Sequence, residues 1–160
     1  MDPLYDTLRK LDTRGRLRHP EIERHFSIGA AQSGGDLSLF DSLYQILQRR
    51  GTASALQALL AGTSIHSSLG FGKYMQGLLY RGGLLHPDQD GRNDPMDLRA
   101  ASVVMTALAD LLDLQIVFLQ RRDDGRVQLN PPVGSGTDTV FLLHEIALGT
   151  DGRVSPLWIR

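Results

Sequence analysis

A helical pattern that runs directly into an apolar strand is the feature of this sequence that most limits its fold. Between residues 98 and 112, apolar side chains recur at three- and four-residue spacing, the pattern of one buried helix face. Asp97 can cap the start of this helix, and Asp113 follows its last turn. Residues 116–119 are all apolar, which is typical of a strand buried on both faces. The sequence therefore predicts a helix that leads straight into a central strand.

Three further strands are expected after this one. The sequence Asp-Asp-Gly-Arg at 123–126 is typical of a hairpin turn, and it leads into a short strand at 127–129. Residues 139–145 and 154–159 are predicted as two more strands, separated by a turn that contains glycine and aspartate. We expect these strands to form a small, mainly antiparallel sheet.

The part of the chain before residue 98 is predicted to be mainly helical. Helices are expected at 3–11, from about 36 to 50, at 53–60 and within 68–85. Residues 12–35 and 86–95 are expected to be irregular, because they are rich in turn-forming and polar residues. A helical first half followed by a small sheet is an α+β fold. With no internal repeat and no second composition, residues 1–160 are expected to form a single domain.

Composition excludes several kinds of site. The 160 residues are 41% hydrophobic, enough for one core, and the net charge of −1 predicts no strong attraction to nucleic acid or membranes. A local basic cluster of Arg14, Arg16, Arg18 and His19 is expected to be a solvated loop. Cysteine is absent, which excludes disulfides, thiolate metal sites and thiol catalysis. The acidic segment 86–95 lacks the ligand spacing of an EF-hand, so neither a metal nor a cofactor is expected.

The sequence also bears on localisation. No apolar run is long enough to span a bilayer, and the N-terminus lacks the apolar core of a signal peptide. We expect a cytoplasmic protein, including the cytoplasm of a host if the chain is exported by another route. A fragment of a larger protein fits equally well.

The segment 34–43 (Gly-Gly-Asp-Leu-Ser-Leu-Phe-Asp-Ser-Leu) has the character of a tight turn followed by a helix. The Gly34–Gly35 pair permits backbone conformations that other residues rarely adopt. Asp36 or Ser38 can cap the helix that follows. Asp41 is expected to be a solvated acid in the first turns, where it suits the helix dipole.

This segment resembles the nucleophile segment of the ovarian tumour (OTU) family of deubiquitinating cysteine proteases. In that family a Gly/Asp-rich turn precedes a cysteine at a helix N-terminus, and a hydrophobic pair, an Asp or Arg and a small residue follow. Ser38 stands where the cysteine is expected, and the positions after it are matched by Leu39, Phe40, Asp41, Ser42 and Leu43. The order of elements is also similar, over a core at about 31–160 with residues 1–30 as an extension. The resemblance implies a papain-like OTU-type fold.

The resemblance implies a nucleophile, a histidine and a group that orients the histidine. Ser38 has the nucleophile position and Asp36 lies close to the position of an orienting acid. The family histidine opens the last core strand, but the matching stretch 153–158 contains none, and the nearest is His144 in the preceding strand. A serine hydroxyl is far less acidic than a thiol, so both departures indicate a degenerate site. The residues expected to line the binding surface are Gly34, Gly35, Leu37, Arg153 and Trp158.

Each of these residues also has a purely structural interpretation. Ser38 is then a helix-capping or first-turn residue, Asp36 a turn residue, His144 a hydrogen-bonded strand residue and Trp158 part of the core.

Three functions follow. The first is a catalytically degenerate OTU-like domain, a pseudoenzyme that binds ubiquitin, a ubiquitin-like protein or another protein, either alone or within an effector, toxin or polyprotein. The second is an active deubiquitinase in which Ser38 replaces a natural cysteine. The third is an unrelated α+β interaction domain. The sequence does not indicate an oligomeric state.

Overall fold

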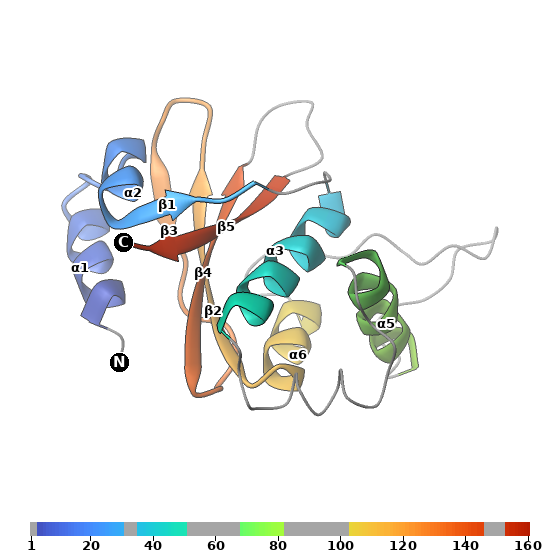
Figure 1. Ribbon diagram of the computed structural model, residues 1–160. Coiled ribbons are helices and arrows are strands. Elements are labelled where there is room, and N and C mark those ends of the chain that lie inside the picture. Colours follow the sequence, from blue (N-terminus) through green and yellow to red (C-terminus); the bar gives the residue numbers. More distant parts are fainter. Residues whose placement is uncertain (1–2, 31–34, 51–67, 82–102, 146–152) are drawn as a thin grey trace.

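The computed structural model describes residues 3–30, 35–50, 68–81, 103–145 and 153–160 (Figure 1). Five helices and five strands lie in these ranges. The α+β class predicted from the sequence is confirmed. In chain order the elements are α1 (Pro3–Thr13), α2 (His19–His25), β1 (Phe26–Ile28), α3 (Gly35–Arg50), α5 (Ser68–Arg81), α6 (Val103–Leu111), β2 (Leu114–Arg121), β3 (Val127–Leu129), β4 (Asp138–Glu145) and β5 (Arg153–Ile159).

The strands form one mixed sheet in the order β1-β5-β4-β2-β3. β2 and β4 run parallel at its centre, while β5 pairs antiparallel with β4 and with β1, and β3 pairs antiparallel with β2. Both outer strands, β1 and β3, are only three residues long. Short edges leave little unpaired backbone on which another chain could add a strand.

Helices cover both faces of this sheet, and the alternation of side chains along the central strands explains why (Figure 1). On β2 and β4, Phe118 and Leu142 join the core beneath α3, α5 and α6. Their neighbours Val117 and Phe141 point to the other face and join the core beneath α1 and α2. The run at 116–119, predicted as a buried strand, is therefore buried on both sides, and so is β4 beside it, as parallel central strands usually are.

The link between α6 and β2 is a tight turn, and it packs so closely against another segment that only glycine fits there. Asp113 has a φ of 56°, in the left-handed region, which ends the helix and redirects the chain into β2. Gly136, from the segment that precedes β4, packs against this turn, and a β-carbon there would overlap the backbone of Asp113 and Leu114. The loop containing glycines at 134 and 136 is thus fitted to the start of the central strand.

Two elements of the fold, α2 and β1, were not predicted from the sequence. Residues 12–35 were expected to be irregular, but they contain α2 and β1. Helix α2 begins with Pro20 in its first turn, and β1 pairs with β5 through Phe26 opposite Ile159. The expected N-terminal extension therefore supplies an edge strand and the helices of the second face.

Several expectations fall on residues that the structure does not describe. These are the helix at 53–60, the loop at 86–95, the start of the helix at 98–102 and the turn at 149–152. Along the described ranges, no helix combines the length and the apolar character needed to cross a membrane.

Candidate functional site

The first turns of α3 meet the start of β5, and Ser38 makes the contact. The Ser38 side chain is fully buried, and its Oγ accepts a hydrogen bond of 2.8 Å from the backbone N–H of Val154. Helix α3 packs along β5, which brings residues far apart in the sequence together (Figure 1). The nucleophile position of the resemblance is therefore a buried point of attachment between helix and strand.

Ser42 completes this attachment from one helical turn further along. Its hydroxyl is also buried and donates a hydrogen bond of 2.9 Å to the carbonyl oxygen of Val154. Residues four apart lie on the same helix face, so both serines reach the same residue of β5. Strand β1 ends at Ile28, opposite Leu157, and Gly29 bonds the carbonyl of Pro156. The serines thus satisfy the backbone of β5 where its neighbouring strand has ended.

His144 lies next to Val154 on the neighbouring strand β4, whereas Ser38 contacts Val154 from helix α3. In the register of β4 and β5, His144 is directly opposite Val154. It shares the α3 face of β4 with Leu142, and its ring centroid is 6.2 Å from that of Phe118 on β2. The structure therefore brings Ser38 and His144 to the same point of β5, with Val154 between them.

The environment of His144 does not favour a charged imidazole. The residue is buried, and desolvation lowers the pKa of its side chain below the ordinary value of 6.5. Its buried Nδ1 has no hydrogen-bond partner among the described residues. A catalytic histidine needs an orienting partner at one nitrogen and a nucleophile at the other. The described residues provide no such orienting partner for Nδ1.

The expectation that Asp41 is solvated was wrong. Asp41 is 3% exposed, and its Oδ2 accepts a hydrogen bond of 2.9 Å from Nε2 of Gln45. The same nitrogen donates 3.0 Å to the carbonyl oxygen of Ala30, which lies just after β1. Gln45 thus connects the helix to the chain that leads away from β1, and this contact covers the carboxylate.

The remaining site predictions are only partly placed. Gly34 lies outside the described residues; Gly35, Asp36 and Leu37 form the first turn of α3, but the side chains of the latter two are not described. Arg153 is exposed at the start of β5. Trp158 lies at the other end of β5, half-buried, and the guanidinium carbon of Arg49 is 4.5 Å from its ring centroid. A cavity of about 250 Å³ opens beside this pair, between α3, β4 and β5.

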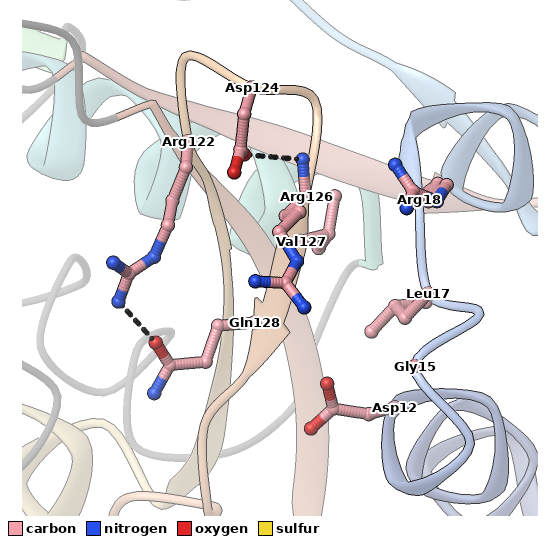
Figure 2. Close-up of a pocket in the computed structure, with 9 residues that line it drawn as sticks. All are labelled: Asp12, Gly15, Leu17, Arg18, Arg122, Asp124, Arg126, Val127 and Gln128. Carbon is pink, nitrogen blue, oxygen red and sulfur yellow. Dashed lines mark hydrogen bonds between the residues drawn. The ribbon is translucent and has the colours of Figure 1, made fainter.

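A second cavity, of about 380 Å³, lies on the other face of the sheet and was not predicted (Figure 2). It separates the turn between α1 and α2 from the hairpin of β2 and β3, and arginines from both segments line it. The signals in the sequence were the basic cluster at 14–19 and the arginines on either side of the hairpin turn. Neither signal indicated that the two segments meet.

Among the described residues no three His, Asp or Glu side chains are grouped in a way that would hold a metal ion. No protein-family model, no curated protein and no solved structure matches the chain.

Proposed function

We propose that this chain is a catalytically degenerate, papain-like domain of the OTU type that binds a protein partner. The observation that carries the proposal is that the Ser38 side chain has a structural role. A residue in the nucleophile position of a working site presents its side chain to substrate, whereas the Ser38 hydroxyl is buried and receives the N–H of Val154.

Two features support the OTU-type part of the proposal. Ser38 lies in the first turns of a helix whose N-terminal end meets the beginning of a core strand, which is the relation that the family resemblance implies. His144 lies opposite the same strand residue, Val154. Both were selected from the sequence alone, from segments about a hundred residues apart.

Two features support the loss of catalysis. Serine lacks the acidity that a thiolate–imidazolium pair requires, and this serine accepts a backbone hydrogen bond. The His144 imidazole has a lowered pKa because of burial, and its Nδ1 has no orienting partner in the described part of the chain. The sequence therefore contains no thiol nucleophile, and the described residues supply no orienting partner for His144.

The proposed partner is ubiquitin or a ubiquitin-like protein. Arg153 is exposed at one end of β5, and Trp158 with Ile159 lies at the other, where Ile159 is 52% exposed. Exposed apolar and arginine side chains are typical of protein-binding surfaces. We propose that the partner contacts the exposed end of β5 around Trp158 rather than the buried serine.

The experiment is a thiol scan at the proposed site. Ser38→Cys is treated with a ubiquitin probe that carries a thiol-reactive group at its C-terminus, and Ser42→Cys serves as the matched control, one turn along the same buried face. We expect no covalent adduct with either folded variant. In parallel, unmodified protein is titrated into isotope-labelled ubiquitin, and chemical-shift changes are expected that Trp158→Ala weakens.

The possible outcomes separate the alternatives. Capture of ubiquitin by Ser38→Cys but not by Ser42→Cys would mean that the site is intact and that serine alone silences a deubiquitinase. The absence of both capture and chemical-shift changes would reject ubiquitin as the partner. A further structure without Ser38 at the helix–strand contact would leave the unrelated interaction domain as the better interpretation.

A further inference from the structure

The cavity on the second face is lined by charged side chains above an apolar floor. Leu17 and Val127 form the floor, both are buried, and the N–H of Val127 donates 3.2 Å to the carbonyl oxygen of Leu17. This bond joins the α1–α2 turn to β3, so the cavity has fixed walls. Figure 2 shows Asp12 and Arg18 on the N-terminal wall and the hairpin side chains on the other.

Two of the arginines face each other across the backbone. Arg18 and Arg126 form an isolated antiparallel β-bridge. Residues directly opposite in such a bridge project from the same side, and like charges in that position are destabilising. Neither guanidinium forms an ion pair with a described residue. The bridge therefore places two positive charges at the cavity, one on each wall, without an ion-pair partner within that part of the chain (Figure 2).

The other charged residues leave this pair available. Oδ1 of Asp124 accepts the backbone N–H of Arg126 at 2.9 Å, so that oxygen holds the hairpin turn. Arg122 donates 2.9 Å to Oε1 of Gln128, which fixes its guanidinium on the hairpin wall. Asp12 is the remaining acid of the lining. With three arginines and two aspartates, the lining carries one excess positive charge.

We propose that this cavity binds a carboxylate side chain of an acidic segment of a partner protein. A single carboxylate matches the one excess charge, and guanidinium groups on opposite walls of the cavity offer N–H donors to its two oxygens. The apolar floor of Leu17 and Val127 accommodates the methylene groups of a glutamate stem. The inference is independent of the proposed function, because the cavity lies on the opposite face from Ser38.

The test is a fluorescence-polarisation titration of the full chain with labelled hexaglutamate, with hexaglutamine as the uncharged control peptide. We expect binding of the first peptide only. Arg18→Gln and Arg126→Gln should each weaken it by about threefold to fivefold, the effect of an exposed charge pair. Asp12→Asn should tighten binding by a similar factor, because it removes a negative charge of the lining that repels the peptide. Circular dichroism shows whether each variant is folded.

The matched control is Arg24→Gln, which removes an arginine from α2 that already pairs with Glu21 at 3.6 Å. It should leave hexaglutamate binding unchanged. Equal weakening by Arg24→Gln would mean that only overall charge attracts the peptide, and the proposal would be wrong. Absence of binding by the folded protein would also overturn it. So would displacement of the peptide by low millimolar phosphate but not by sodium chloride of equal ionic strength, since the cavity would then be a phosphate site.

Discussion

Ser38 and Ser42, one turn apart on α3, bind opposite backbone groups of the same residue of β5. Ser38 accepts the N–H of Val154 and Ser42 donates to its carbonyl oxygen. The helix face thereby supplies the hydrogen-bond partners for the backbone of β5 that a neighbouring strand supplies elsewhere in the sheet. The arrangement explains why a serine-containing helix start is compatible with a fully buried position.

The first prediction concerns this pair. Ser42→Ala leaves the buried carbonyl of Val154 without its hydroxyl partner, and we expect the free energy of unfolding to fall by about 1–3 kcal/mol. Ser38→Ala should have an effect of the same size on the N–H side. Urea denaturation followed by circular dichroism measures both. The control is Ser27→Ala on β1, an exposed serine, which should change the value by no more than about 0.5 kcal/mol. Equal effects at positions 27 and 42 would contradict the role assigned to Ser42.

The second prediction concerns pH. Burial lowers the pKa of His144 in the folded protein, whereas in the unfolded chain its pKa is ordinary. As the pH falls through about 6.5, the unfolded chain takes up a proton that the folded protein does not, so stability decreases. For one proton the slope is at most about 1.4 kcal/mol per pH unit. His144→Leu should reduce this slope between pH 8 and 5.5, and should not destabilise at pH 8, because it removes the unpartnered Nδ1. An unchanged slope in the variant would assign the pH dependence to other groups.

The third prediction concerns the turn before β2. Gly136→Ala places a methyl group on the backbone of Asp113 and Leu114, which cannot move without shifting the central strand. We expect a loss of more than about 2 kcal/mol in the free energy of unfolding. Gly125→Ala is the comparison: its φ is 81°, yet no atom lies within 4 Å of the added methyl group. That variant should lose only about 1 kcal/mol, the cost of the left-handed conformation. The reverse order of the two losses, measured by thermal or urea denaturation, would refute this account.

The fourth prediction uses the single tryptophan of the chain as its own probe. The Arg49 guanidinium covers the Trp158 ring at 4.5 Å, and Arg49→Gln uncovers it. We expect the fluorescence emission to move to longer wavelength and the free energy of unfolding to fall by about 0.5–1 kcal/mol. Arg24→Gln, on helix α2 of the other sheet face, should leave the emission spectrum unchanged. Identical spectra for wild type and Arg49→Gln would exclude the stacking.

The strands and long helices were predictable because their patterns are local. The apolar run at 116–119 and the periodicity of α3 both arise from burial against neighbours, and each is visible in a short window of sequence. The extent of β2 was underestimated, since its flanking polar residues pair with β4 in the same register as the apolar ones.

The features that were missed depend on contacts distant in sequence. Strand β1 has three residues and no period of its own; it exists because β5 lies beside it. Asp41 is buried because Gln45 reaches the carbonyl of Ala30, and nothing in the helical pattern indicates that contact. The second cavity requires the α1–α2 turn to meet the hairpin, which is likewise a tertiary event. Within the candidate site, the sequence selected Ser38 and His144 but gave no sign of the serine pair around Val154.

The pairing of β1 with β5 has a consequence for how the chain folds during its synthesis on the ribosome. The side chain of Arg160 donates to the carbonyl oxygen of Glu23, 137 positions earlier, and Phe26 is paired with Ile159. Strand β1 therefore has no strand partner until residues 157–159 have been synthesised. Contacts of such long sequence separation slow folding and prolong the exposure of apolar side chains. We expect nascent chains to need a chaperone until β5 has left the exit tunnel.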